Sequence, residues 1–151
     1  MSYNEFETRK KRISAWFDEY ITSTFTSVSK FGHLESRHLN KNDDFLKARC
    51  KRLRKDVSSF IGKEEEILHV LVSMILRNRE ELIEYLADTE DNDVWELSED
   101  ITPNIRGIKY CSSMDHNWKD GAKECKDKII IAFKKNPNNR NELVITSTYP
   151  T

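Results

Sequence analysis

The sequence predicts an α+β domain in which N-terminal helices pack on a C-terminal antiparallel β-sheet. Three observations support this class. Apolar residues recur at helical spacing in the N-terminal part of the chain, two segments near the C-terminus are rich in β-branched residues, and a polar stretch with a proline separates those two segments. Helices followed by a run of antiparallel strands are typical of the α+β class.

The composition suits one domain with one core. The chain has 151 residues, of which 37% are hydrophobic and 10% aromatic. It has no apolar run of about 18 residues, so we expect no membrane span. Residues 1–12 are polar, so we expect no secretory signal, and something outside this chain would have to export the protein.

The charge is balanced. There are 25 Lys and Arg side chains and 26 Asp and Glu side chains, which gives a formal net charge of -1. This balance excludes a uniformly basic nucleic-acid-binding surface but not a local basic site. The cysteines Cys50, Cys111 and Cys125 form no metal-type pair, so we expect reduced, buried or half-buried thiols, with a redox or nucleophilic cysteine as the alternative.

The N-terminal part is predicted to be mainly helical. We expect helices over 4–21, most of 33–55, 64–79 and 80–86, the last either a separate helix or a continuation after a bend. A connector is expected over 22–30, with a short strand as the alternative. Asn42 or Asp43 is expected to cap a helix. Ser58–Gly62 is predicted to be a turn. The segment 67–76 is apolar almost all round, so we expect it to lie in the core.

The C-terminal part is predicted to be a sheet. Strong strand patterns cover 128–134 and 142–149, and residues 136–141 with Pro137 are expected to form the hairpin loop between them. The acidic segment 88–100 contains a short strand candidate at 94–97. Residues 105–113 alternate in part, with Gly107 as an expected bulge, and 112–122 is expected to be a polar loop.

Four histidines are the first candidates for chemistry near neutral pH. His69 lies within the apolar helix and is expected at the core or its boundary, whereas His116 is expected to be solvated in a loop. His33 and His38 are five residues apart, but no carboxylate or cysteine at ligand spacing accompanies them. We therefore predict no metal site.

Arg49 follows His38 by eleven residues, which is about three helical turns. A histidine beside an arginine suits phosphodiester chemistry, because the imidazole moves a proton while the guanidinium neutralises phosphate oxygens. The alternative is a capping histidine and an ordinary surface arginine. The surrounding basic residues indicate either a solvated helix face or a phosphate-binding surface: Lys47, Arg49, Lys51, Arg52, Arg54 and Lys55.

The last strand carries several hydroxyl groups. Alternation places Ser147 and Tyr149 on one face with Ile145 behind them, and Thr146 and Thr148 on the other face unless a bulge intervenes. Hydroxyl groups can donate hydrogen bonds to a reacting phosphate. The alternative is a polar terminal strand without chemistry.

The segment from Gly32 to Arg49 resembles the opening motif of a known family. The motif runs G-H-x-x-x-[KR]-H-V-G-K-[ST]-D-x-x-L-x-x-R, and eight residues match it in register: Gly32, His33, Arg37, His38, Lys41, Asp43, Leu46 and Arg49. Ser58-Ser59-Phe60 and the ending 145–150 are also similar to the family. The family is the bacterial RNase A-like toxin domain of contact-dependent growth inhibition proteins (CdiA C-terminal toxins). Leu39 and Asn40 replace its usual Val-Gly.

The resemblance implies an RNase A-like domain over 32–151, preceded by a helix and connector over 1–31. It implies a ribonuclease that needs no metal or cofactor, that is exported as part of a larger toxin, that acts on RNA in the target-cell cytoplasm and that a cognate immunity protein inhibits. His38 would be the acid/base, Arg49 the phosphate stabiliser, and Tyr149 would act with Ser147 or Thr148. Substrate contacts would come from His33, Arg37 and Lys41.

Two other functions stay open at this level. One is a non-catalytic RNA- or protein-binding module with the same fold. The other is a phosphodiesterase that acts on a small nucleotide. Incubation with RNA separates the module from the ribonuclease, because the module would bind RNA without cutting it. The phosphodiesterase would process cyclic or dinucleotide substrates but spare long RNA.

Overall fold

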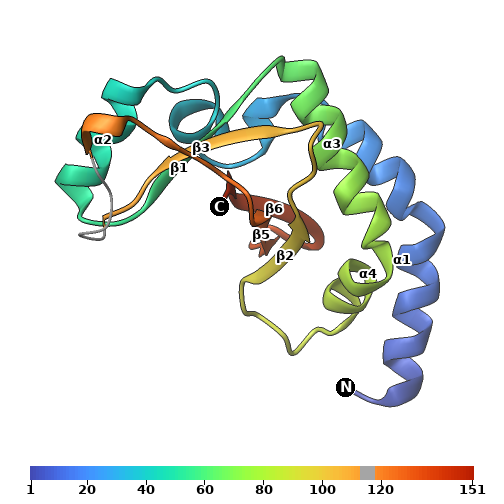
Figure 1. The fold of residues 1–151 in the computed structure, drawn as a ribbon. Helices are drawn as coiled ribbons and strands as arrows, with labels where there is room; N and C mark the ends of the chain where they lie inside the picture. Colours follow the sequence, from blue (N-terminus) through green and yellow to red (C-terminus); the bar gives the residue numbers. More distant parts are fainter. Residues whose placement is uncertain (113–117) are drawn as a thin grey trace.

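The computed structural model describes residues 1–112 and 118–151 of the chain (Figure 1). His116 lies outside the described residues. The helical elements are α1 (Tyr3–Thr24), η1 (Val28–Lys30), η2 (Leu34–His38), α2 (Asp43–Leu53), α3 (Glu64–Arg77), α4 (Arg79–Ala87) and η3 (Trp118–Asp120). The strands are β1 (Val57–Ile61), β2 (Trp95–Asp100), β3 (Arg106–Tyr110), β4 (Lys123–Glu124), β5 (Lys128–Asn136) and β6 (Asn139–Pro150).

Helices α1, α3 and α4 largely confirm the helices that the sequence pattern predicts. Ser2 caps α1, because its hydroxyl accepts from the Glu5 N–H at 3.1 Å. The predicted helix over 64–79 ends two residues earlier, at Arg77, and α4 follows directly. The core or boundary position expected for His69 is wrong, since α3 buries one stripe against the sheet and His69 lies on the exposed side.

The predicted helix over 33–55 is interrupted. Leu34–His38 forms one π-helical turn, and Asn40 adopts a left-handed conformation with a φ of 51°. The α2 helix then starts under a cap by Asn42, whose side-chain oxygen accepts from the Phe45 N–H at 2.9 Å. His38 therefore precedes α2 and lies outside any continuous helix with Arg49.

The turn predicted at Ser58–Gly62 is wrong. Residues Val57–Ile61 form β1, which pairs antiparallel with β3. Two adjacent serines are typical of turns, but here Ser59 is 0% exposed and its hydroxyl is satisfied locally, donating to the Phe60 carbonyl at 3.0 Å. A β-strand can therefore bury the Ser59 side chain.

Two antiparallel three-stranded sheets form the β part, in the orders β1-β3-β4 and β2-β5-β6. The β5–β6 loop is tighter than expected, because Asn136 already pairs with Asn139. No bulge occurs at Gly107, where the β1–β3 register is continuous. Gly107 instead permits close approach, since a Cβ there would lie 2.7 Å from the Pro150 ring.

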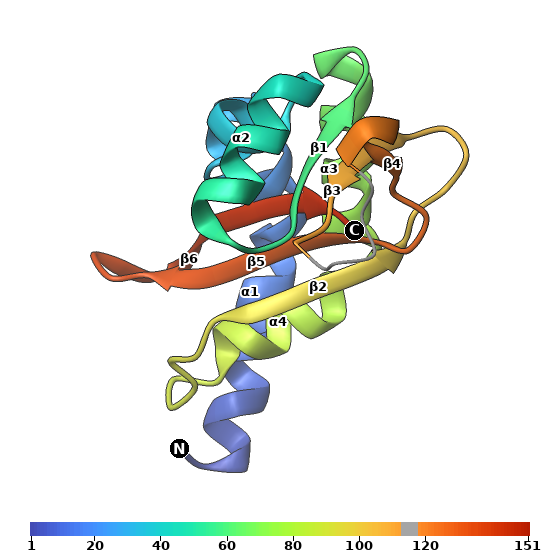
Figure 2. The same cartoon turned by 60° about the vertical axis from the view of Figure 1, so that its left-hand side comes forward.

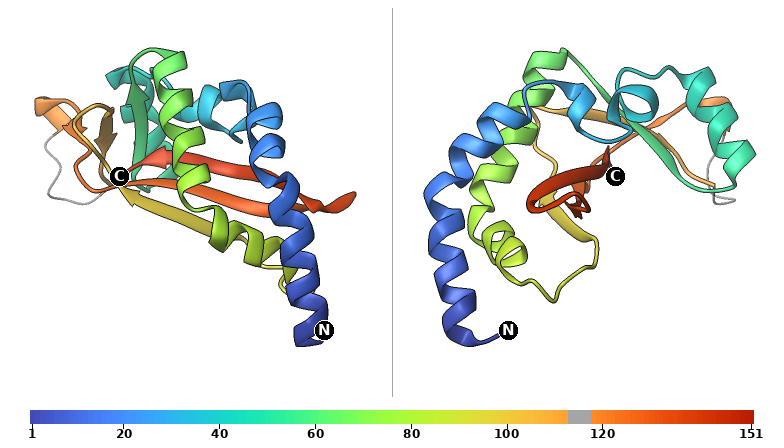
Figure 3. Two further views of the ribbon diagram at one scale, coloured as in Figure 1. Left: turned by 90° about the vertical axis from the view of Figure 1, so that its right-hand side faces the viewer. Right: turned by 180° about the vertical axis from the view of Figure 1, so that it is seen from behind.

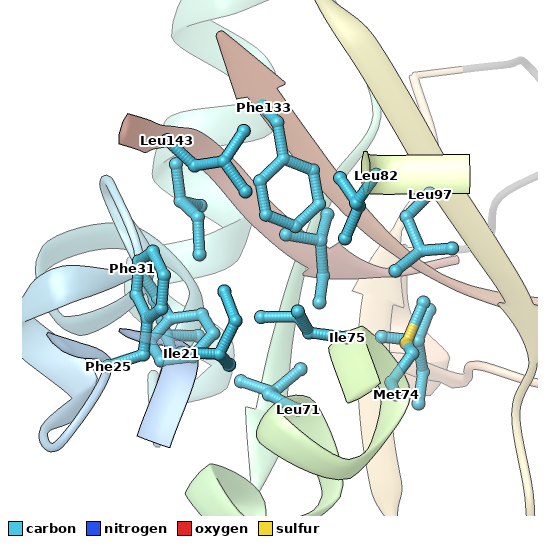
Figure 4. Close-up of a cluster of buried hydrophobic side chains, with 14 of the residues drawn as sticks. Ile21, Phe25, Phe31, Leu71, Met74, Ile75, Leu82, Leu97, Phe133 and Leu143 are labelled. Carbon is cyan, nitrogen blue, oxygen red and sulfur yellow. The ribbon is translucent and has the colours of Figure 1, made fainter. Parts of the chain in front are cut away.

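Helices α1, α3 and α4 lie together on one side of the β2-β5-β6 sheet (Figure 3). Side chains from these helices and strands build the main core, including Ile21, Leu71, Ile75, Phe133 and Leu143 (Figure 4). The α+β class is thus confirmed. The boundary at residue 31 stays a prediction, and α1 contributes buried side chains to the same core.

A second, smaller cluster joins α2 to the β1-β3-β4 sheet. It contains Leu46, Cys50, Val57, Ile108 and Tyr110. Cys50 and Cys125 are buried and Cys111 is half-buried, which confirms their expected packing. None of the described helices is both long enough and apolar enough to cross a membrane.

Candidate functional site

The segment 38–41 is held along β1 by a series of hydrogen bonds. The Nδ1 atom of His38 lies 2.8 Å from the Ser58 carbonyl oxygen, and the Asn40 N–H donates to the Phe60 carbonyl at 2.7 Å. The Asn40 side chain both donates to and accepts from the backbone of Gly62, each at 2.9 Å. These bonds fix the His38 ring and the backbone that follows it against β1.

A cleft of about 410 Å³ opens where η2, α2, β1 and β6 meet. Figure 2 shows α2 and β1 beside the long β5–β6 hairpin, although these elements are far apart in the sequence. Ten residues line the cleft: His33, Arg37, His38, Arg49, Lys55, Asp56, Val57, Ser58, Ser147 and Tyr149.

The hydrogen bond to Ser58 fixes the tautomer of His38. A carbonyl oxygen can only accept, so Nδ1 carries the proton and, in the neutral ring, Nε2 is left as a free acceptor. Burial lowers the pKa of His38 from 6.5 to about 4. The hydrogen bond to Ser58 raises this pKa, whereas the charges of Arg49 and Arg37 lower it further. At neutral pH the ring is therefore an uncharged base.

Arg49 supplies a guanidinium with free donors. Its Nε atom is buried and has no hydrogen-bond partner among the described residues, and none of the ion pairs found there involves its side chain. Burial lowers the pKa of Arg49, and the neighbouring charges of Arg37 and Arg52 add to that effect. A guanidinium stays charged at neutral pH, so an anion would restore the missing interactions.

A β-bulge decides which hydroxyl groups of β6 face the cleft. The register with β5 shifts between Ala132 and Phe133, which leaves Thr146 as the extra residue. Ile145 therefore lies on the buried face, whereas Ser147 and Tyr149 face the cleft. Thr148 is 0% exposed, outside the cleft lining, and its hydroxyl has no partner among the described residues.

Tyr149 lies against the histidine. The centroids of its ring and of the His38 ring are 5.7 Å apart. Burial raises the pKa of Tyr149, with a smaller contribution from Glu96, so its hydroxyl stays protonated and can donate at neutral pH.

Six of the eight sequence-predicted site residues thus come together: His33, Arg37, His38, Arg49, Ser147 and Tyr149. Thr148 and Lys41 do not line the cleft, and the Lys41 ammonium lies over the Phe45 ring instead. Sequence reasoning missed Lys55, Asp56, Val57 and Ser58. Lys55 belonged to the noted basic run, but nothing in the sequence indicates that the Ser58 carbonyl binds a histidine.

The cleft is strongly positive. Arginine, lysine and histidine side chains surround it, and Asp56 is the carboxylate that lines it. That carboxylate is already engaged, since one oxygen accepts from the Ser112 N–H at 2.8 Å. The arrangement suits an anion that carries several acceptor oxygens, such as a phosphate.

No family model and no curated protein matches the sequence. A solved structure does match: a chain of the crystal structure of a CdiA-CT/CdiI complex from Y. kristensenii 33638. The TM-score is 0.63 at 22% sequence identity, and the match covers 80% of this chain and 99% of that chain. At this identity the match shows a shared fold.

Proposed function

We propose that the chain is an RNA endonuclease of the RNase A-like toxin class that needs no metal. The observation that carries the proposal is the meeting of His38, Arg49, Ser147 and Tyr149 in one positively charged cleft. These residues come from the segment before α2, from α2 itself and from β6. The motif resemblance and the fold shared with a chain of a CdiA-CT/CdiI complex support the same assignment.

In the proposed reaction the 2′-hydroxyl of RNA attacks the adjacent phosphorus. His38 Nε2 takes the proton of that hydroxyl, a role that suits a neutral ring whose Nδ1–H is held by Ser58. The new 2′-oxygen–phosphorus bond forms while the bond to the 5′-oxygen breaks. The products are a 2′,3′-cyclic phosphate and a 5′-hydroxyl, whose proton comes from a cleft donor or from water.

The other groups stabilise charge and position the phosphate. Arg49 neutralises the phosphate oxygens in the transition state, using donors that have no partner within the described protein. Ser147 and Tyr149 donate hydroxyl hydrogen bonds to the same phosphate, and His33 and Arg37 bind the adjoining part of the strand. Because the nucleophile belongs to the substrate, DNA should not be cut.

The decisive experiment is cleavage of RNA in EDTA by purified protein. The wild type should cut RNA but not DNA, and should leave 2′,3′-cyclic phosphate ends. His38→Ala should lose roughly 100-fold or more of the rate, as removal of a general acid/base predicts. His69→Ala is the matched control, since His69 is an exposed histidine that does not line the cleft. Undiminished cleavage by His38→Ala would overturn the mechanism, and RNA that is bound but intact would indicate a binding module.

We also propose that a cognate immunity protein covers this cleft and that the domain is delivered into a target cell as part of a larger toxin. The partner should be acidic, because the surface it must mask is basic. Co-purification with the product of the neighbouring gene tests this, and Arg37→Glu should weaken that complex. A complex unaffected by charge reversal in the cleft would argue against the proposed mode of inhibition.

A further inference from the structure

An aromatic–cation pair lies at the start of α2, where Phe45 is one turn before Arg49 and Lys41 precedes the Asn42 cap. The Phe45 side chain is 40% exposed, and the Lys41 Nζ atom lies over its ring, 5.2 Å from the centroid. Neither residue lines the cleft. Lys41, which matches the family motif, thus lies outside the cleft. It lies beside the ring of Phe45, a position at which the motif specifies no residue.

Phe45 and Arg49 are close neighbours on the helix surface. They are four residues apart within α2, so their Cβ atoms are about 6 Å from each other. Side chains of an α-helix lean toward its N-terminus, so the Arg49 side chain leans toward the turn that carries Phe45. If Arg49 binds a phosphate, the next nucleotide of the strand would therefore be within reach of the Phe45 ring.

We propose that Phe45 and Lys41 form a second nucleotide-binding subsite beside the cleft. The Phe45 ring stacks on the base of a nucleotide that flanks the scissile phosphate, and the Lys41 ammonium binds a phosphate of the same strand. An aromatic platform next to a cation is how proteins bind single-stranded nucleic acid. An exposed cation–π contact is weaker than a base stack, so the base displaces Lys41 from the ring and leaves its ammonium free for the phosphate.

This inference rests on the ribonuclease proposed above and assigns where its substrate extends. The chain offers a matched control for the pair itself. Lys10 lies over the ring of Phe6 at 5.4 Å with the same four-residue spacing, but on α1, whose N-terminal half is remote from α2 in Figure 1. A second control is Leu53, which is 38% exposed on the same helix as Phe45.

The test measures binding of a six-nucleotide 2′-O-methyl RNA, which cannot be cleaved because its 2′-oxygens are blocked. Phe45→Ala should weaken binding about tenfold, the effect of removing one base–aromatic stack. Phe45→Trp should retain binding, because it keeps an aromatic platform. Phe6→Ala and Leu53→Ala should stay within about twofold of the wild type. Circular dichroism and thermal melting check that each variant is folded.

A scan with abasic nucleotides locates the stacked base. At one position next to the scissile phosphate, loss of the base should weaken binding by the wild type but cause no further loss in Phe45→Ala. Two results would overturn the subsite. One is that Phe45→Ala binds within twofold of the wild type. The other is that, at every position, loss of the base weakens binding by the same factor in the wild type and in Phe45→Ala. Since no cleavage is needed, a wild type that binds through Phe45 without cutting RNA would overturn the ribonuclease and keep the subsite.

Discussion

His38 illustrates how a single backbone contact sets the chemistry of a residue. Its Nδ1–H is bound to the Ser58 carbonyl, so the neutral ring presents Nε2 to the cleft. Burial and the nearby guanidinium groups of Arg49 and Arg37 disfavour the charged ring. Burial is the main reason that the base is deprotonated at neutral pH, and the positive charge that suits a phosphate adds to that effect.

The depressed pKa of His38 predicts a stability loss in acid. Between pH 6.5 and about 4 the unfolded chain binds a proton at this histidine that the folded protein does not bind, so the free energy of unfolding falls as the pH falls through that window. The two pKa values correspond to a contribution of about 3 kcal/mol. His38→Gln should remove this part of the pH dependence.

Urea unfolding of the wild type and His38→Gln at pH 7, 5.5 and 4.5 measures the effect. His69→Gln is the control, because His69 is exposed. An equal pH dependence in the wild type and His38→Gln would show that the ring titrates normally and is not a pre-formed neutral base.

At the scale of elements, the segment between η2 and α2 is held against β1 through Asn40. Asn40 has a φ of 51°, and its amide makes two hydrogen bonds to Gly62. The family motif has glycine at this position. Asn40 thus keeps the left-handed backbone and adds a side-chain anchor to the end of β1.

Replacing Asn40 separates these two contributions. Asn40→Gly keeps the backbone conformation but loses both side-chain bonds, so the free energy of unfolding should fall by about 1 kcal/mol. Asn40→Ala loses the bonds and also strains the left-handed backbone, so the fall should be about 2–3 kcal/mol. Urea unfolding gives both values. Equal stability of the wild type and Asn40→Gly would mean that the amide is not an anchor.

Gly32, which precedes η2, lies against the bulge of β6. Its φ is +64°, and a Cβ there would lie 2.5 Å from the Thr146 carbonyl oxygen and 3.0 Å from the Ser147 nitrogen. Gly32→Ala must therefore displace η2 or β6 next to Ser147. We expect a loss of about 3 kcal/mol and a fall in RNA cleavage, because backbone strain and a backbone clash add.

Gly121→Ala is the control for Gly32→Ala. Gly121 has a φ of +77°, but its Cβ would meet the flexible carboxylate of Asp43 at 3.1 Å. It should therefore cost only the strain of the left-handed conformation, about 1–2 kcal/mol. Thermal unfolding and RNA cleavage of both variants test the difference. If Gly32→Ala costs no more than Gly121→Ala, β6 does not depend on this close approach.

The sequence predicted the elements that follow a strict period, namely α1, α3, β5 and β6. It failed at β1, where buried serines in Val57–Ile61 mimic a turn, and at the π-helical turn before His38. Both depend on contacts between distant segments, which no local pattern records. The bulge at Thr146 belongs to the same class. Alternation placed Ser147 and Tyr149 on one face, as the structure does, but it could not exclude a bulge that would bring Thr148 to that face instead.

At the scale of the whole molecule, a net charge of -1 hides a separation of charge. Ion pairs within the described residues join α1 to α4, α3 to β2, and β3 to β4, but none uses a cation of α2 or of the cleft. Seven of the 26 acidic side chains lie within 88–100. The cations of α2 and of the cleft, which take part in none of these ion pairs, can therefore attract a polyanion.

This separation predicts how the binding of RNA depends on salt. Each cation that contacts a phosphate of a single strand contributes about -0.7 to the slope of log K against log salt concentration. Lys55 lines the cleft and Arg52 lies close enough to lower the pKa of Arg49. A double variant, Arg52→Gln with Lys55→Gln, should therefore reduce the slope by about 1.4 for a 2′-O-methyl oligonucleotide, whereas Lys10→Gln with Lys11→Gln on α1 should leave it unchanged. Equal reductions in both double variants would mean that RNA responds to overall charge, and the cleft would lose its electrostatic support.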